Sequence, residues 1–242
     1  MPRDTSVVVG VACLLLLGCS SESRTAPAQV PPLPGASAGM AFTPPRDPRM
    51  DDRLIAAAGR GDLAAVRRAH VRGASVDARD RRGRTALIAA AYGNHVAVAR
   101  FLIAAGADVN AKDETVQSAY LISTAEVGDD PRLLDLTIAN GARINDKDSF
   151  NGTALIRAAD RGYPRIVRRL LREDIDIDHV NRLGWTALHE AIILGDGSRR
   201  YVEVVRLLIR AGADVSLRDD GLTALEHAQA RGYEEMVRIL RG

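Results

Sequence analysis

Several residue types are scarce in this 242-residue chain, and each scarcity excludes a kind of function. The only cysteines, Cys13 and Cys19, precede Ser20, so the remainder can form no disulfide, thiolate–metal site or cysteine nucleophile. Aromatic residues make up 4% of the chain, against 46% for all hydrophobic residues. This ratio predicts a core of small aliphatic side chains, which suits closely packed helices.

Neither sign of charge prevails, since the formal net charge is +2. The balance gives no indication of nucleic acid binding, and we expect none. Most basic residues are arginines. Many lie in segments that we expect, from the repeats described below, to form one helix row with an exposed ridge of arginines: Arg67, Arg68, Arg100, Arg165, Arg168, Arg169, Arg206, Arg210 and Arg238. We interpret this ridge as a solvated helix face, with attraction to anionic lipid or another polyanion as the alternative.

Long apolar runs are also absent, with one exception at Val7–Leu17. This run is shorter than the roughly 20 residues of a membrane-spanning helix. It follows Arg3 and precedes a cysteine, which is the layout of a secretory signal, so we expect a signal peptide at residues 1–19. An uncleaved membrane anchor is an alternative.

The stretch Leu16-Leu17-Gly18-Cys19 resembles the lipobox of bacterial lipoproteins. The resemblance implies that Cys19 is acylated and becomes the mature N-terminus. An exported protein would then be attached to a membrane of the bacterial cell envelope, on its periplasmic or outer surface. Ordinary signal cleavage without acylation is the alternative.

Residues 20–48 predict a flexible linker. They hold seven of the ten prolines, are rich in serine and alanine, and show no apolar periodicity. Such a composition favours an extended spacer rather than a packed core. We therefore expect the folded domain at residues 49–242.

The chain repeats itself from Asp51 onward. Thr-Ala-Leu begins at Thr85, Thr153, Thr186 and Thr223, with a degenerate copy at Ser118. A second marker, Gly-Ala, keeps the same phase at Gly73, Gly106, Gly141 and Gly212. A period of about 33 residues indicates a solenoid, with approximate repeats at 51–80, 81–113, 114–148, 149–180, 181–219 and 220–242.

Each repeat predicts two helices and a turn. The threonine is a helix N-cap for an alanine-rich first helix. That helix ends at a residue tolerant of the left-handed conformation: Gly61, Gly162 and Gly232, or Asn94. The second helix carries apolar residues at helical spacing, and the Gly-Ala segment leads back to the next N-cap.

This unit, with "GADVNAKD" and "GWTALHEA", resembles the ankyrin repeat. The resemblance implies an all-α solenoid of helix-turn-helix units with short β-hairpin-like turns, in about five full repeats plus a partial terminal one. It also implies a monomeric, non-enzymatic scaffold that binds an unidentified protein partner through its concave face and turn tips, without a cofactor or metal.

Some repeats are irregular. Val116 stands where a turn glycine is expected, Glu173-Asp174 replaces Gly-Ala, and the inter-helix loops are lengthened at Val127–Pro131 and Asp196–Arg200. Solenoids tolerate such insertions. The alternative is an envelope enzyme accessory or a ligand- or metal-binding protein, for example in oxidative-stress defence, that uses the irregular third to fifth repeats.

Two motifs resemble chemical sites. His189-Glu190 could serve acid–base or metal chemistry, but the register places His189 at a helix start, and no catalytic constellation accompanies it. His189 and His227, early in neighbouring first helices, form the nearest histidine pair. The run Asp174–Asp178 alternates with isoleucines, which predicts an extended arm with carboxylates in water, calcium binding being the alternative.

The resemblance also predicts which residues face a partner. They lie on turn tips and the exposed side of first helices: Arg81, Arg82, Arg84, Tyr92, Glu114, Gln117, Phe150, Arg161, Arg182, Leu183, Trp185 and Leu222. Phe150 and Trp185 matter most among them, because aromatic anchors carry a large share of interface energy. The alternative for Trp185 is packing against its neighbouring turn.

Overall fold

The computed structural model describes residues 47–242. The predicted signal peptide, Cys19 and nearly all of the predicted linker lie outside the described residues. The first helix begins at Pro48, the last residue assigned to the linker, because the Asp47 side chain accepts the Arg49 N–H and caps that helix. The folded part thus starts slightly earlier than expected.

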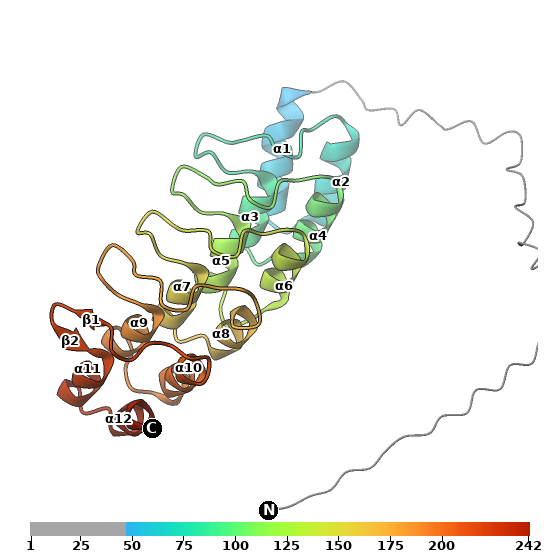
Figure 1. The fold of residues 1–242 in the computed structure, drawn as a ribbon. Helices are drawn as coiled ribbons and strands as arrows, with labels where there is room; N and C mark the ends of the chain where they lie inside the picture. The colour runs from blue at the N-terminus through green and yellow to red at the C-terminus, as the bar shows by residue number, and fades with distance from the viewer. Residues whose placement is uncertain (1–46) are drawn as a thin grey trace, which may run out of the picture. The chain divides into compact units, whose positions relative to one another are not determined.

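Within residues 47–242, helices alternate between two rows (Figure 1). The first helices of successive repeats form the inner row: α1 (Pro48–Gly59), α3 (Ala86–Tyr92), α5 (Ala119–Ala125), α7 (Ala154–Asp160), α9 (Ala187–Ile193) and α11 (Ala224–Ala230). The second helices form the outer row: α2 (Leu63–Val71), α4 (Val96–Ala104), α6 (Arg132–Ala139), α8 (Pro164–Leu170), α10 (Arg199–Arg210) and α12 (Glu234–Arg241). The predicted all-α solenoid is confirmed, and the last repeat retains both helices.

The turns project from the inner row as a series of parallel loops (Figure 1). In the last turn, β1 (Arg218–Asp219) pairs antiparallel with β2 (Leu222–Thr223), with Asp219 opposite Leu222. A single bridge joins Lys147 and Thr153 in an earlier turn. The β-hairpin-like turns are therefore as predicted, with regular strands in one of them among the described residues.

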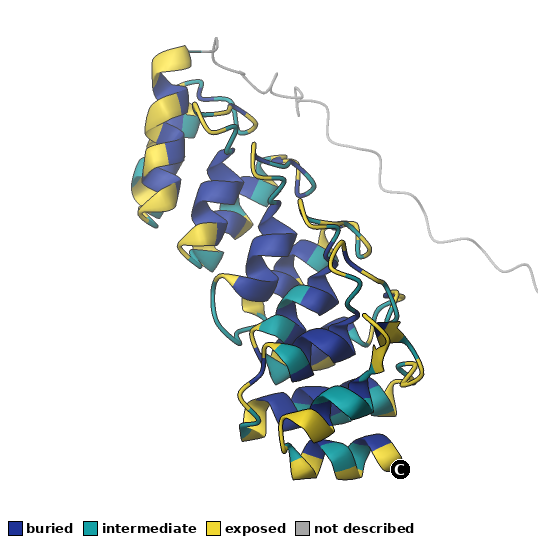
Figure 2. Cartoon of the chain, turned by 90° about the vertical axis from the view of Figure 1, so that its left-hand side faces the viewer, coloured by how far each residue is buried: buried dark blue, intermediate teal, exposed yellow. Residues whose placement is uncertain are grey.

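The core lies between the two rows and between successive repeats, where the inner helices are buried along most of their length (Figure 2). Alanines predominate on the inner helices, for example at Ala90, Ala158 and Ala191, and branched residues such as Leu102 and Leu170 fill the space beneath them. Small side chains let the inner helices approach closely, so burial is shared along the stack rather than gathered in one centre.

The helix ends follow the predicted signals. The side chain at each N-cap of α3, α5, α7, α9 and α11 accepts a backbone N–H three residues later: Thr85, Ser118, Thr153, Thr186 and Thr223. Asn94 adopts the left-handed conformation with φ of 51°. Val116 does so as well, with φ of 63°, although a β-branched residue is strained there.

The lengthened loop at Val127–Pro131 has a structural task. The α8 N-cap, Tyr163, makes no side-chain capping bond. Instead the Asp129 carboxylate accepts the N–H groups of Arg165 and Ile166 at 3.1 and 2.9 Å. A residue of one repeat therefore caps the outer helix of the next, which explains this insertion without a functional site.

The second insertion differs from the prediction. Helix α10 begins at Arg199, so Arg199 and Arg200 are helical rather than part of a longer loop. Ser198 precedes the helix in extended backbone, and Tyr201 reaches back to donate its hydroxyl to the Asp160 carbonyl at 2.8 Å. The extra residues thus lengthen the outer helix, because their charged side chains can stay exposed while Tyr201 and Val202 are buried.

An Asp/Asn ladder joins the repeats at the base of the turns. At equivalent places in successive repeats, a side-chain oxygen accepts a backbone N–H of the next repeat: Asp77 from Asp108, Asn110 from Arg143, Asn145 from Asp176 and Asp178 from Asp214. The Asp178 carboxylate therefore accepts a backbone N–H of the next repeat, whereas the sequence predicts a carboxylate in water. In residues 47–242 no group of three potential ligands forms a metal site.

Candidate partner-binding site

The turns that follow α2, α4, α6 and α8 are each organised around one Asp or Asn side chain, which we call the turn hub. Its oxygen accepts the N–H groups of the residues two and four positions later. Asp148 accepts from Phe150 and Gly152, both at 2.8 Å, and Asn181 from Leu183 and Trp185 at 2.9 and 3.1 Å. Asp80 and Asp113 do the same in the earlier turns. This bonding fixes each tip relative to the helix that follows.

In the turns after α6 and α8, the hub also pairs with a side chain on the following inner helix. The Arg157 guanidinium donates to Asp148 at 2.8 Å, and the Asn181 amide donates to Glu190 Oε1 at 2.7 Å. His227 pairs with Asp219 in the same way. Asn181 is an amide where the other hubs are carboxylates, and it faces an acid where its neighbours face a base.

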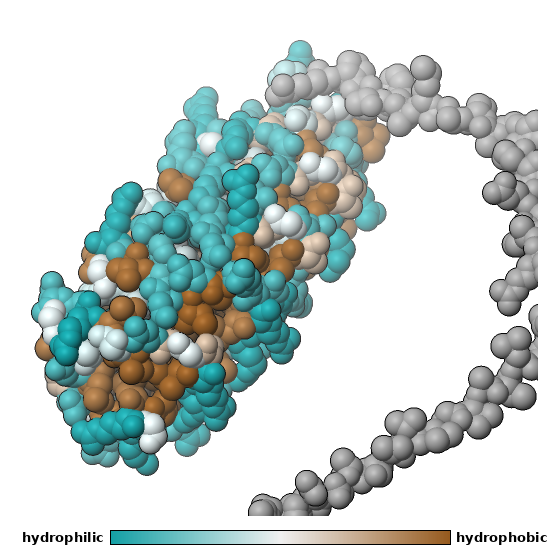
Figure 3. Space-filling view, in the orientation of Figure 1, coloured by the Kyte–Doolittle hydropathy of each residue, from teal (hydrophilic) through white to brown (hydrophobic). Residues whose placement is uncertain are grey.

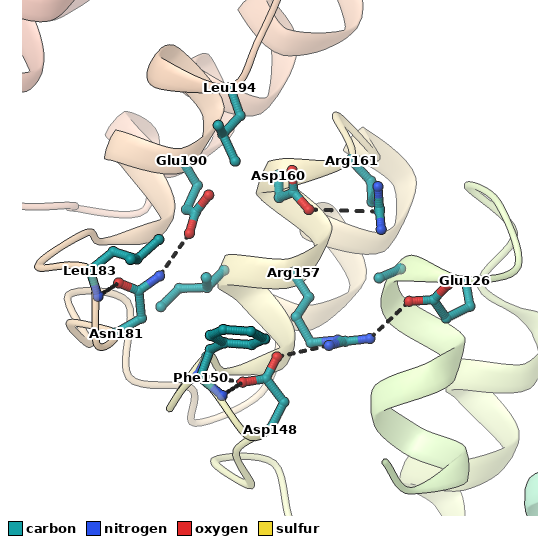
Figure 4. A pocket seen from close by; sticks show the side chains of 13 residues that line it. Glu126, Asp148, Phe150, Arg157, Asp160, Arg161, Asn181, Leu183, Glu190 and Leu194 are labelled. Carbon is teal, nitrogen blue, oxygen red and sulfur yellow. Dashed lines mark hydrogen bonds and ion pairs between the residues drawn. The ribbon is translucent and has the colours of Figure 1, made fainter. Parts of the chain in front are cut away.

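A pocket of about 300 Å³ opens on the inner face between α5, α7 and α9 (Figure 4). We call it the recognition pocket. It is lined by Ala125, Glu126, Asp148, Phe150, Gly152, Ile156, Arg157, Asp160, Arg161, Asn181, Leu183, Glu190 and Leu194. Two turn tips and the ends of three inner helices therefore meet around one cavity.

Charge in the recognition pocket is unevenly compensated. The Arg157 guanidinium lies between two acids, 2.8 Å from Asp148 and 3.2 Å from Glu126. Arg161 is exposed and its Nε is 3.6 Å from Asp160. Glu190 has no cation beside it within the described residues and relies on the Asn181 amide (Figure 4).

Glu190 is the most perturbed acid of the pocket. It is 4% exposed, and its Oε2 atom has no hydrogen-bond partner within the described residues. Burial, with the nearby Asp160 carboxylate, raises the pKa of Glu190 to about 7, although the Asn181 hydrogen bond acts in the opposite direction. A buried acid with a free oxygen at the wall of an open pocket is suited to receive a ligand group.

Comparison with known proteins decides the family. A family model described as "Ankyrin repeats (3 copies)" matches residues 121–219, and one described as "Ankyrin repeats (many copies)" matches residues 54–103. The crystal structure of an ankyrin repeat domain from Acinetobacter baumannii AYE is 43% identical, with a TM-score of 0.73, and the match covers 78% of this chain and 95% of that one. This chain is an ankyrin-repeat protein.

Other relatives agree. The crystal structure of EF0377, an ankyrin repeat protein, is 34% identical with a TM-score of 0.72, over 79% of this chain and 97% of that one. The ankyrin repeat protein YahD of Escherichia coli (strain K12) is 37% identical over 52% of this chain. The chain spans 63% of the length of that relative. Ankyrin repeats generally mediate contacts between proteins and are typically non-enzymatic.

His189 has a structural role in this ankyrin-repeat protein. It is 1% exposed, accepts the Thr186 N–H at Nδ1 and donates its own backbone N–H to the Thr186 hydroxyl, which completes a capping box. Burial lowers the pKa of His189, while the Asp219 carboxylate, 3.9 Å from Nε2, opposes the shift. The ring is thus held neutral at the helix start, as the repeat register predicts.

His189 and His227 do lie together, with ring centroids 6.2 Å apart in an edge-on arrangement. His227 contacts the same carboxylate of Asp219. This cluster braces the last turn against two inner helices, and it has no place among the residues that line the recognition pocket. The two chemical hypotheses for "HE" therefore separate, since His189 faces the next repeat and Glu190 faces the previous one.

Three of the predicted partner-facing residues meet at the recognition pocket: Phe150, Arg161 and Leu183. Phe150 and Leu183 are 65% and 58% exposed, which is unusual for large apolar side chains. Arg84 and Tyr92 line a separate cavity nearer the N-terminal end. The others line neither of these two cavities: Arg81, Arg82, Glu114, Gln117, Arg182, Trp185 and Leu222.

Trp185 requires a correction, because it is only partly exposed rather than a free tip. It is the residue immediately before the N-cap, and its carbonyl accepts the Asn181 N–H at 3.0 Å. Arg84 and Gln117 occupy the same place, accept the same bond and are partly buried as well. The chain at this point already returns to the helix, so the true tips are two residues earlier, where Leu183 stands.

Glu190 and Asn181 are not among the partner-facing residues predicted from the sequence. One signal for Glu190 and Asn181 is present in the aligned repeats. The hub is Asp at 80, 113 and 148 but Asn at 181, and nine residues later an acid replaces the arginine of the preceding repeat. A paired change from Asp/Arg to Asn/Glu indicates that the two side chains touch.

Proposed function

We propose that this ankyrin-repeat protein is a non-enzymatic interaction scaffold that holds a partner protein on its inner face, at the recognition pocket. The observation that supports it best is the exposure of Phe150 and Leu183 on two neighbouring tips, where both line a cavity with buried polar groups. Apolar anchors around a pocket are typical of interface centres. On the face that Figure 3 shows, apolar residues form a broken band between hydrophilic ones.

We propose in addition that the protein is exported and attached through Cys19 to a membrane of the bacterial cell envelope. The support is the lipobox-like sequence before Cys19 and the proline-rich segment after it. Among residues 47–242, no helix is long and apolar enough to cross a membrane. Mass spectrometry of the mature N-terminus tests the proposal, which predicts a diacylglycerol thioether at Cys19 and fails if the mature chain begins elsewhere.

The scaffold proposal is tested by capture of the partner in native envelopes. Chemical crosslinking followed by affinity purification of the full chain should yield a defined protein adduct. The double variant Phe150→Ser/Leu183→Ser should lose that adduct, because both apolar anchors are removed.

The matched control is Val71→Ser/Val215→Ser, which removes two exposed apolar side chains that do not line the recognition pocket. This control should retain the adduct. Loss of the adduct in both variants, or in neither, contradicts the proposed surface. Light scattering of the purified chain tests the accompanying proposal that it is a monomer.

A further inference from the structure

The recognition pocket carries a net acidic character that points to the chemistry of its occupant. Four carboxyl groups line it, from Glu126, Asp148, Asp160 and Glu190, against two guanidinium groups. The two terminal nitrogens of Arg157 pair with Asp148 and Glu126, so its charge is balanced by acids already in the pocket. Asp160 lies 3.6 Å from Arg161, so among the pocket acids Glu190 alone has no cation beside it within the described residues. Glu190 and Asp160 lie on facing sides of the pocket (Figure 4).

The hydrogen bonding of Glu190 distinguishes this pocket from a surface cluster of acids. Its Oε1 atom is held at 2.7 Å by the Asn181 amide, which fixes the carboxyl plane. Its Oε2 atom is buried without a partner within the described residues. A buried acceptor left open in this way is costly unless a donor arrives from outside.

The walls around these acids are apolar. Phe150 and Leu183 stand at the tip side, and Ile156 and Leu194 complete the wall. An aliphatic stem can pack against such a surface while its charged end reaches the carboxylates, and a cation beside Phe150 gains a further attraction to the ring. A volume of about 300 Å³ suits one extended side chain rather than a folded segment.

Other occupants fit less well. Residues 47–242 contain no group of three potential metal ligands close enough to hold an ion, so a divalent cation lacks its coordination shell here. An anion would meet four carboxyl groups, and the two guanidinium groups of the pocket already pair with acids. A neutral apolar side chain would leave Glu190 Oε2 buried without a donor.

We propose that the recognition pocket receives one lysine or arginine side chain from an extended segment of the partner protein, with Glu190 and Asp160 contacting its cationic end and Phe150 and Leu183 its stem. This inference rests on the proposed function, since it names the part of the partner that the scaffold holds. Asn181 is a positioning residue, because it orients Glu190 and does not itself need to touch the partner.

A peptide set tests the proposal with defined probes. Nine-residue peptides with one central Lys, Arg, norleucine or citrulline in otherwise identical apolar surroundings are titrated against the full chain in mild detergent. The Lys and Arg peptides should bind at least about tenfold more tightly than their uncharged counterparts, because each pairs with a carboxylate that is otherwise unsatisfied. Equal binding of the norleucine peptide overturns the proposal, as does equal binding of free spermidine, which would make the site a polyamine pocket.

Variants locate the effect. Glu190→Gln keeps the acceptor for Asn181 and should weaken Lys-peptide binding about tenfold or more, and Asp160→Asn, at a more exposed acid, should weaken it severalfold. Glu234→Gln makes the same charge change on exposed α12 and should leave binding unchanged. A melting temperature measured for each variant separates lost binding from lost folding, and Asp160→Asn provides the test if Glu190→Gln does not fold.

The same variants separate this inference from the proposed function. If the native partner is captured by wild type and lost with Phe150→Ser/Leu183→Ser, but is captured fully by both Glu190→Gln and Asp160→Asn, the scaffold stands and the basic side-chain pocket is wrong. If no protein is captured by wild type at all, the scaffold itself is wrong.

Discussion

At the scale of single residues, the ionised form of Glu190 that we propose for partner binding is also the form that lowers the stability of the fold. Burial and the Asp160 and Asp148 carboxylates raise the pKa of Glu190 to about 7. Its one hydrogen-bond donor in the described residues is Asn181, and the nearby Arg157 is paired with Asp148 instead. In the unfolded chain the pKa of Glu190 returns to 4.5. The folded state therefore holds the proton more tightly than the unfolded state between these values, and ionisation of Glu190 opposes folding.

The first prediction follows from the sign of that shift. Because the folded-state pKa is raised, the stability contributed by protonated Glu190 is present below about pH 4.5 and lost as the pH rises through about 7. Glu190→Gln should therefore be more stable than wild type at pH 8, by up to roughly 3 kcal/mol, and equal to it at pH 4. Urea unfolding at the two pH values measures this. A variant less stable than wild type at pH 8 would show that Glu190 is satisfied within the fold.

His189 shifts in the opposite direction, and its effect cancels in that comparison because both proteins contain it. Its lowered pKa means that the neutral ring is favoured in the folded state. Stability from this group is lost as the pH falls below the ordinary histidine value of about 6.5. Ionisation of Glu190 thus destabilises the fold as the pH rises, and protonation of His189 destabilises it as the pH falls.

A second prediction concerns the Asn181–Glu190 pair. Asn181→Asp keeps the hub oxygen that accepts the Leu183 and Trp185 N–H groups but removes the donor to Glu190. At pH 8 we expect a loss of about 1–3 kcal/mol, since two carboxylates then face each other. The double variant Asn181→Asp/Glu190→Gln restores a donor and an acceptor and should recover most of the loss in urea unfolding. Additive effects of the two changes would contradict the pairing.

The sequence predicts these residues unequally. Thr186 and His189 can be placed from one repeat, because an N-cap and its bracing residue are local in the chain. The role of Glu190 cannot be predicted from one repeat, because it depends on contact with the Asn181 hub nine residues earlier and on Asp160 in the preceding repeat. Trp185 was misplaced because the register gives its position in the turn but not the return of the backbone toward the helix.

At the scale of elements, the insertions serve the helices. Asp129 replaces the missing cap of α8, and Arg199 and Arg200 extend α10. Sequence periodicity locates both insertions by their length. It cannot show that the first supplies a cap to another repeat, because the donor and acceptor lie more than a full period apart.

We therefore expect Asp129→Ala to destabilise the domain by about 1 kcal/mol, the usual cost of a lost helix cap. The amide protons of Arg165 and Ile166 should exchange faster, because they lose their acceptor. Hydrogen exchange followed by NMR measures both effects, with Glu114→Ala at an exposed tip as the control. Unchanged exchange at Ile166 would mean that α8 is capped in another way.

The turn between α4 and α5 allows a substitution that should stabilise the protein. Val116 holds a left-handed backbone with φ of 63°, at the place that Gly83 occupies in the preceding turn and Gly184 in a later one. Val116→Gly should stabilise the protein by about 1 kcal/mol, because relief of strain of about 1–3 kcal/mol outweighs the greater freedom of glycine in the unfolded chain. Thermal unfolding checks the sign, and Gly184→Val should destabilise by a similar mechanism. A destabilised Val116→Gly would indicate that the valine side chain contributes packing beyond its strain.

At the scale of the whole domain, the repeats provide a rigid frame for a local site. The Asp/Asn ladder ties each turn base to the next repeat, and the hubs fix the tips above the inner helices. Such a frame could be predicted from the period alone, and the recognition pocket could not. It forms where two repeats differ at the same place, at Arg157 on α7 and Glu190 on α9, with Glu126 at the end of α5.

The central claim is that a partner protein binds the inner face at the recognition pocket, and a photo-crosslinking scan in native envelopes tests it most directly. A photoreactive amino acid is placed singly at inner-face positions 150, 161, 183 and 194, and at outer positions 172, 210 and 238, all of which are exposed. We expect one discrete adduct from the inner-face positions, strongest at 150 and 183, and none from the outer positions. Adducts that arise mainly from positions 172, 210 and 238, or from no position, would contradict the account.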